Sequence, residues 1–371
     1  MIWLLAVAIL ALLYPYVIFP ALMALISGLP RKNRAVPDAR LPRIAILISA
    51  YNEAGHILDK LANFKEMDYP AGRLRMWIGT DGSEDGTAGI IRQANVPGVT
   101  LVERFSRGGK TAVLNDLASR ARAEETDLFV FSDVNAFFLP GTLRLLAAPF
   151  VDEPQTGLVS GRSLMRGDNG QVVVEGSYYR FETWLKERQS RRGWLAGAFG
   201  PIYAMRANLY RELNPALIND LTHPCQVSAL GYDCRFLPEA VAEESAGDDA
   251  GREFSRQTRM TAQASYVLLT QMPALFPAGR WGQIWVLISH KWMRWTAGLW
   301  IIAGFIALAA TSPPLAALAL AGLLILLLGW RAKANWASLP CYFLLVHTAY
   351  LNGLLQAIRG NRFVVWKPRA G

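Results

Sequence analysis

Polar side chains follow three apolar stretches of the sequence, at the points where each stretch ends. Asn52 and Glu53 follow "ILISAY", Asp81 follows "MWIGT", and Asp133 follows "LFVFS". A carboxylate that follows a buried strand can accept a hydrogen bond from a base or hold a divalent cation against phosphates, while the strand fixes its position. The sequence therefore predicts a polar ligand site built at strand ends.

The tetrapeptide "SDVN" has the composition of a site for a hard metal ion. Asp133 offers an anionic oxygen and Asn135 a carbonyl oxygen, and both suit Mn²⁺ or Mg²⁺. The absence of a neighbouring His or Cys argues against zinc. Each motif alone also has a structural interpretation: Asp133 as the cap of a helix or turn, "DGSEDGT" as a turn before a helix, and "YNE" as a helix N-cap.

The elements that must position these residues alternate between two periodicities. Apolar runs predict strands at 43–49, 74–80, 99–104 and 127–132, and amphipathic stretches predict helices at 54–64, 87–94 and 110–121. Such alternation is typical of an α/β fold with a parallel sheet covered by helices. Ligands of open α/β sheets bind at the carboxyl ends of the strands, where the polar residues above fall.

The N-terminal region has the composition of a membrane span. Residues 1–29 carry no charged side chain and exceed the roughly 20 residues that cross a bilayer core. A cleaved signal peptide is the alternative, but no basic residue precedes the apolar run, and the cations lie after it, in the linker 30–42. Those cations predict an external N-terminus and a cytoplasmic domain at 43–250.

The C-terminal part, 296–371, is again apolar. Residues 295–330 are uncharged and broken only at "TSPP", which predicts a hairpin of two spans, whereas 334–358 contains polar residues and we expect it not to cross fully. Within 251–295, the Trp- and cation-rich stretch 280–295 predicts an amphipathic helix at headgroup level, with a buried helix as the alternative. Much of the basic charge lies next to the apolar segments, and no stretch has the signature of a nucleic-acid module. We therefore interpret the net charge of +9 as a sign of lipid contact.

Five ordered motifs resemble those of the family 2 glycosyltransferases, nucleotide-sugar enzymes with a GT-A (Rossmann-like) fold. They are "SAYNE", "TDGSEDGT", "RGGKTAVLN", "FSDVN" and "GAFGPIYAMR". The group includes the cellulose and hyaluronan synthases and ceramide glucosyltransferase. The resemblance, which covers about residues 43 to 270, implies that Asn52, Glu53, Asp81 and Lys110 lie in the nucleotide pocket. It also places Asp133 and Asn135 at the family's D-x-D metal site, with Asn in place of the second Asp.

The same resemblance assigns roles to residues further along the chain. "LINDLTHP" stands at the position of the family's catalytic carboxylate, which makes Asp220 the general base, unless it only caps the helix that follows. For His223 the expectation is a surface or substrate-lining position. "EFSRQTRM" resembles the Q/R-x-x-R-W helix, with Arg256 and Arg259 as a diphosphate clamp and Met260 at the Trp position.

The C-terminal "FVVWKPRAG" resembles a gating segment of hyaluronan synthases, which implies that Trp366 and Arg369 return to the donor site. The function implied is inverting transfer from a nucleotide-sugar, with a UDP-sugar favoured, to a lipid or polysaccharide acceptor at the cell membrane, as a multi-pass protein with a cytoplasmic catalytic domain. Two alternatives remain open: a catalytically weak nucleotide-sugar-binding subunit, and a phosphoglycosyl-type transferase acting on a lipid phosphate. A partner subunit or a homo-oligomer is also left open.

Overall fold

The computed structural model describes residues 1–31, 35–166, 177–245 and 250–364, and its contacts divide the chain into two compact units. We call them the α/β unit and the helical unit. The α/β unit is formed by Ser27–Gly247, Leu269–Ile284 and Phe363–Gly371. The helical unit is formed by Met1–Ile26, Asp248–Leu268 and Trp285–Arg362.

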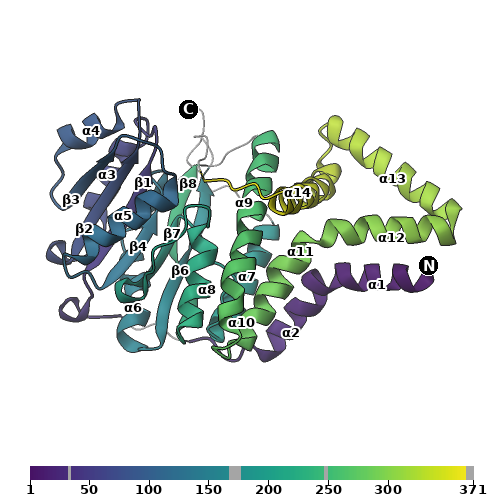
Figure 1. The fold of residues 1–371 in the computed structure, drawn as a ribbon, viewed down its shortest axis with the longest axis horizontal. Helices are drawn as coiled ribbons and strands as arrows, with labels where there is room; N and C mark the ends of the chain where they lie inside the picture. The colour runs from purple at the N-terminus through teal and green to yellow at the C-terminus, as the bar shows by residue number, and fades with distance from the viewer. Residues whose placement is uncertain (32–34, 167–176, 246–249, 365–371) are drawn as a thin grey trace. The chain divides into compact units, whose positions relative to one another are not determined.

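An eight-stranded sheet forms the centre of the α/β unit (Figure 1), with the order β3-β2-β1-β4-β7-β6-β8-β5. The four strands at one side, β3, β2, β1 and β4, run parallel, as the alternation of elements predicts. The bounds of the strands are β1 Ile44–Ala50, β2 Leu74–Asp81, β3 Val99–Arg104, β4 Leu128–Ser132, β5 Ala136–Phe138, β6 Thr156–Arg166, β7 Ile202–Arg206 and β8 Asp233–Ser245.

The other half of the sheet is mixed, which the sequence did not predict. β7 runs antiparallel to β4 and β6, while β6 and β8 pair in parallel. The short β5 adds antiparallel to β8, with Ala136 opposite Glu244. Only three residues, 133–135, lie between β4 and β5, so they connect two strands of the same sheet.

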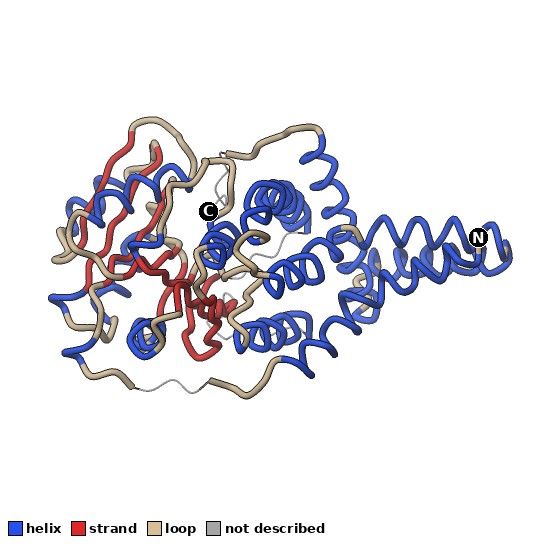
Figure 2. The backbone as a smooth tube through the Cα atoms, turned by 60° about the horizontal axis from the view of Figure 1, so that its bottom comes forward, coloured by secondary structure: helices blue, strands red, loops and turns tan. Residues whose placement is uncertain are grey.

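Helices cover both faces of this sheet, which Figure 2 shows as strands in red flanked by helices in blue. Side chains alternate along β1, so Ile46 packs on one face and Leu47 on the other. The first face is covered by α3 (Ile57–Glu66), α4 (Thr87–Ala94) and α6 (Thr142–Asp152). The second is covered by α5 (Lys110–Arg122) and α8 (Asn219–Ala229), and α7 (Ser177–Arg191) packs against β8. The seven elements predicted between 43 and 132 are all confirmed, within a few residues at their ends.

The helical unit contains the apolar segments. Three helical stretches in the described residues are long and apolar enough to cross a membrane: Ile2–Ile26, Pro313–Arg331 and Asn335–Ile358. The first comprises α1 (Ile2–Leu13), η1 (Tyr14–Ile18) and α2 (Phe19–Ile26); the others are α13 and α14, and most of α9 (Ala250–Gln271) completes the unit.

In the predicted hairpin of two spans, the first helix, α12 (Ala297–Thr311), is short. α12 ends and α13 begins at the predicted break, but α12 has 15 residues, about 22 Å of helix, which is too short to cross a bilayer core by itself. It meets the criterion for a span only together with Trp281–Trp295, from which it is bent by 55°. The stretch 281–295 is divided into α10 (Trp281–Val286), η6 (Leu287–Trp292) and α11 (Met293–Trp295).

Two cations of the stretch 280–295, for which the sequence predicts an amphipathic helix at headgroup level, contact groups of the protein. Arg294 is buried in the helical unit, with its guanidinium over the ring of Tyr16. Arg280 donates hydrogen bonds to the backbone carbonyls of Ser228 and Tyr232 in the α/β unit. Both guanidinium groups therefore contact protein groups, and the helix at headgroup level stays a prediction.

Candidate active site

The loops that follow β1 and β2 are tied to each other by hydrogen bonds. The Asn52 side-chain oxygen accepts from the Glu84 backbone N–H at 2.9 Å, and the Asn52 N–H donates to the Ser83 hydroxyl at 3.1 Å. The Glu53 N–H donates to the Thr87 hydroxyl at 2.9 Å. Asn52 has a φ of +53°, a left-handed conformation that Asn tolerates better than most residues. The two polar elbows of the sequence thus form one structure at the carboxyl edge of the sheet.

Asp81 holds the glycine-rich loop that precedes α5. Its side chain is 2% exposed, and its two carboxylate oxygens accept the backbone N–H groups of Gly108 and Gly109 at 2.7 and 2.9 Å. Gly109 has a φ of +84°, and a Cβ there would lie 2.2 Å from the carbonyl oxygen of Val364. The loop therefore needs glycine for its conformation and for the approach of the C-terminal segment. Asp81 acts through this loop on the position of Lys110.

Asp133 and Lys110 meet at the end of β4. The Lys110 ammonium forms an ion pair with the Asp133 carboxylate, and both side chains are 32% exposed, so solvent and ligands can reach them. Asn135 is half-buried two residues later. The Asp133 carboxylate thus already binds a cation, here an ammonium group.

This donor set suits a divalent cation that is shared with a phosphorylated ligand. Asp133 and Asn135 supply oxygen atoms only, which are the ligands that Mg²⁺ and Mn²⁺ prefer. In the part of the chain that the structure describes, no group of three or more His, Cys, Asp or Glu could hold a metal. A cation at Asp133 would therefore take most of its ligands from phosphate and water, as Mg²⁺ commonly does.

Asp220 is connected to the same loop system through α5. The Thr111 hydroxyl, next to Lys110 in the chain, donates to the Leu217 carbonyl at 2.9 Å and to the Asn219 side chain at 3.1 Å. Asp220 is half-buried in the first turn of α8, whose N-cap is Ile218, so Asp220 is not the N-cap residue. Consecutive residues of α5 thus contact Asp133 and the beginning of α8.

A glycine leaves room for the Asp220 carboxylate. A Cβ on Gly200 would lie 3.3 Å from Oδ2 of Asp220, closer than side chains normally pack. The Asp220 backbone carbonyl accepts the Ala198 N–H at 2.7 Å. The pKa of Tyr203 is raised by burial and further by the negative charges of Asp220 and Asp133. The "GAFG" segment therefore faces the predicted base.

His223 is part of the core, which corrects the expectation of a surface or substrate-lining position. Its side chain is 0% exposed, lies against Phe131 and Tyr210, and its Nδ1 shares a hydrogen bond of 3.0 Å with the Tyr203 hydroxyl. Burial lowers the pKa of His223 to about 3, so the imidazole is neutral at physiological pH. Three aromatic residues, Phe131, Tyr203 and Tyr210, surround the imidazole, and they are the sequence signal for a buried histidine here.

The remaining predicted site residues belong to the helical unit or lie outside the described residues. Arg256 and Arg259 belong to the helical unit, as does Met260. There Arg256 forms a bidentate pair with Glu253, at 2.8 Å for each bond, and donates to the Met260 sulfur. Trp366 and Arg369 lie outside the described residues, which end at Val364.

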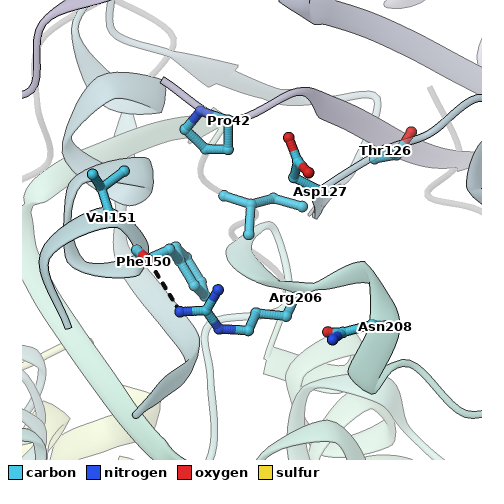
Figure 3. A pocket seen from close by; sticks show the side chains of 8 residues that line it. Pro42, Thr126, Asp127, Phe150, Val151, Arg206 and Asn208 are labelled. Carbon is cyan, nitrogen blue, oxygen red and sulfur yellow. Dashed lines mark hydrogen bonds between the residues drawn. The ribbon is translucent and has the colours of Figure 1, made fainter. Parts of the chain in front are cut away.

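A cavity of about 320 Å³ lies away from this site, at the amino end of β4 (Figure 3). Asp127, Arg206 and Asn208 contribute polar groups to its lining. The Arg206 guanidinium donates to the carbonyl oxygens of Phe150 and Thr156, at 3.0 and 2.8 Å, so it is used within the fold. This cavity is separated from Asp133 by the length of β4.

Most of the residues at the polar edge of the sheet belong to a stretch that matches a known protein family. Residues 45–213 match the family described as Glycosyl transferase family 2. The chain contains a family 2 glycosyltransferase domain. This domain includes Asn52, Asp81, Lys110 and Asp133, and it ends seven residues before Asp220.

Curated relatives of the glycosyltransferase domain are distant in sequence. The chain is 24% identical over 255 residues to a probable glycosyltransferase, YdaM, of Bacillus subtilis, covering 65% of this chain and 59% of that protein. It is 23% identical over 234 residues to a beta-monoglucosyldiacylglycerol synthase of Trichormus variabilis, covering 60% of this chain and 49% of that protein. The chain thus spans half to three-fifths of the length of these relatives.

The fold of the chain is similar to that of a solved structure. The mannosyltransferase PcManGT of Pyrobaculum calidifontis, solved with GDP-Man and Mn²⁺, aligns with a TM-score of 0.71 and 20% identity. The alignment covers 97% of this chain and all of that chain. The predicted GT-A class, with apolar helices before and after the α/β region, is therefore confirmed.

Proposed function

We propose that the chain is an inverting glycosyltransferase that moves a sugar from a nucleotide-sugar, with a UDP-sugar as the first candidate, to an acceptor lipid in the membrane. The observation that carries this proposal is the connected cluster at the carboxyl edge of the sheet. There, Asp81 holds the loop before Lys110, Lys110 pairs with Asp133, and Thr111 binds the first turn of α8, which carries Asp220.

In the proposed reaction Asp220 acts as the general base. The acceptor hydroxyl oxygen forms a bond to the anomeric carbon while the bond from that carbon to the phosphate oxygen breaks. The hydroxyl proton passes to the Asp220 carboxylate, and the nucleoside diphosphate leaves. Attack from the face opposite the leaving group inverts the anomeric configuration.

The leaving diphosphate needs positive charge, for which the chain offers two sources. Lys110 can donate hydrogen bonds to phosphate oxygens when it moves from Asp133. Asp133 and Asn135 would hold a divalent cation, which would stabilise the developing charge of the diphosphate. The Mn²⁺ bound to PcManGT supports this assignment by analogy of fold.

A lipid acceptor is favoured by features outside the catalytic edge. The helical unit contains stretches apolar enough to cross a membrane, and the beta-monoglucosyldiacylglycerol synthases among the relatives act, by name, on a lipid. Met260 stands where processive synthases of the family carry a Trp, which argues against a growing polysaccharide. By the charge asymmetry around the first apolar stretch, the α/β unit lies on the cytoplasmic side of the membrane.

The proposal can be tested with purified chain, Mn²⁺, and a panel of UDP- and GDP-sugars presented to vesicles that contain diacylglycerol. Mass spectrometry of the lipids should detect a product heavier by one hexosyl residue with one donor, and release of the matching nucleoside diphosphate. A product that retains the donor phosphate would show a phosphoglycosyl transferase instead. No product with any donor, despite nucleotide binding, would show a catalytically silent binding subunit.

A further inference from the structure

Lys60 is a fully buried lysine directly behind the Asp133–Asn135 turn. It lies on the inner face of α3 and is 0% exposed. Its Nζ donates to the Ser132 hydroxyl at 3.0 Å and to the Ala136 carbonyl oxygen. These two acceptors are the residues immediately before and after the turn, so one amine contacts both of its ends.

The same helix holds the strand that follows the turn. Asn63, one turn after Lys60, receives the Phe138 N–H at 2.9 Å and donates to the Phe138 carbonyl at 2.8 Å. The Lys60 ammonium also lies 4.8 Å from the centre of the Phe138 ring. α3 therefore fixes β5 in two places, and Lys60 adds the bond that reaches back to the end of β4.

An apolar side chain would fill this position at lower cost. Burying an ammonium group is unfavourable unless its N–H groups are bonded. Lys60 has two acceptors, Ser132 and Ala136, which is enough for the two N–H groups of a neutral amine but leaves one N–H group of an ammonium without either of them. Opposite Ala136 in the sheet lies Glu244, which is also buried. Burial lowers the pKa of Lys60 to about 7, although the negative charges of Asp133 and Glu244 raise it in part. A group that costs this much to bury and touches both ends of one turn points to a role for that turn.

We propose that Lys60 is a positioning residue, which holds the Asp133–Asn135 turn so that both side-chain oxygens are presented to one cation. The proposal rests on the proposed function, since it assumes that the turn binds a divalent cation together with the donor diphosphate. Residues behind metal ligands orient them, and their loss typically costs about 10- to 100-fold in metal affinity. Lys60 would act in this way through the backbone and Ser132, without touching substrate or metal.

The chain offers a matched control in Lys186. This lysine is also buried, donates to a backbone carbonyl, that of Gly197, and lies 4.8 Å from the ring centre of Phe199. Lys186→Met removes a buried amine of the same kind from a different loop. Lys60→Met and Lys186→Met should therefore lower thermal stability by comparable amounts, while only the first should change metal binding.

The experiment measures Mn²⁺ binding by the electron paramagnetic resonance signal of free Mn²⁺, with the whole 371-residue chain and either UDP or GDP. Lys60→Met should raise the Kd for Mn²⁺ by about 10- to 100-fold. Lys60→Gln, which keeps N–H groups on a shorter side chain, should give an intermediate Kd, and Lys186→Met should give the wild-type Kd. In turnover, Lys60→Met should raise the KM for Mn²⁺ far more than it lowers kcat at saturating metal.

The outcomes separate this proposal from the function on which it rests. A wild-type Kd in folded Lys60→Met, or equal increases in Lys60→Met and Lys186→Met, would overturn the positioning role. If Lys60→Met does not fold, Lys60→Gln decides by the same criterion. Wild-type protein that binds no Mn²⁺ with either nucleotide would instead overturn the metal site of the proposed function.

Discussion

Replacing Asp220 by Asn removes the proposed base and keeps the shape of the side chain. The Asp220 backbone carbonyl still accepts the Ala198 N–H at 2.7 Å, and the space left by Gly200 is the same. The expected loss is therefore chemical. General-base assistance is worth about 10² to 10⁴ in rate, so Asp220→Asn should lower kcat by that factor, about 3 to 5 kcal/mol in transition-state stabilisation.

Asp81→Ala serves as the comparison for Asp220→Asn, because we expect it to weaken nucleotide binding. Asp81 accepts two backbone N–H groups, and hydrogen bonds to a charged group contribute about 1.5 to 3 kcal/mol each. Its loss should release the loop that carries Lys110 and weaken nucleotide binding by about 10-fold or more. Calorimetric titration with UDP and GDP and the steady-state release of nucleoside diphosphate separate the two effects. Near wild-type turnover in Asp220→Asn, or a loss of nucleotide binding as large as in Asp81→Ala, would refute the assignment of the base.

Three further predictions concern the surroundings of the site. Asp133→Ala should abolish activity and Asn135→Ala should reduce it, because only Asp133 contributes charge; full turnover of wild-type protein in EDTA would contradict this. Gly200→Ala should lower kcat by roughly 10-fold at unchanged nucleotide affinity, because the added methyl lies 3.3 Å from the Asp220 carboxylate; an unchanged kcat would show that the carboxylate adapts. Between pH 7 and pH 10 the unfolded chain holds a proton on Lys60 that the folded protein has lost, because burial lowers the pKa of Lys60 to about 7. Wild-type stability should therefore rise with pH relative to Lys60→Met, by up to about 1.4 kcal/mol per pH unit, in thermal unfolding at pH 7, 8 and 9, whereas parallel curves would contradict the lowered pKa of Lys60.

The first half of the α/β unit was predictable because its signals are local. β1, β2 and β4 are continuous apolar runs, as expected for strands covered on both faces, and each ends in the polar residues of the site. Chain connectivity then favours the parallel order, because a helix connects each strand to the next from β1 to β4. The predicted Asp81, Lys110 and Asp133 accordingly lie in one connected structure.

The second half depends on pairings between distant segments, which no local pattern encodes. β6 pairs with β8 through two shifts in register, at Thr156/Leu158 and at Ser160/Arg162. β5 has only three residues and joins the sheet because β8 offers it an edge. Lys60 and His223 are fully buried because of this tertiary packing. The sequence alone would predict an apolar residue at each of these two positions.

The most direct test of the account follows one donor molecule through one turnover. Purified protein in lipid vesicles should convert an α-linked UDP- or GDP-sugar into a β-linked glycolipid, with one nucleoside diphosphate released per sugar transferred, as measured by NMR of the anomeric proton and by nucleotide chromatography. A glycolipid that retains the α configuration, or release of nucleoside monophosphate with a sugar phosphate on the lipid, would contradict inverting transfer by Asp220.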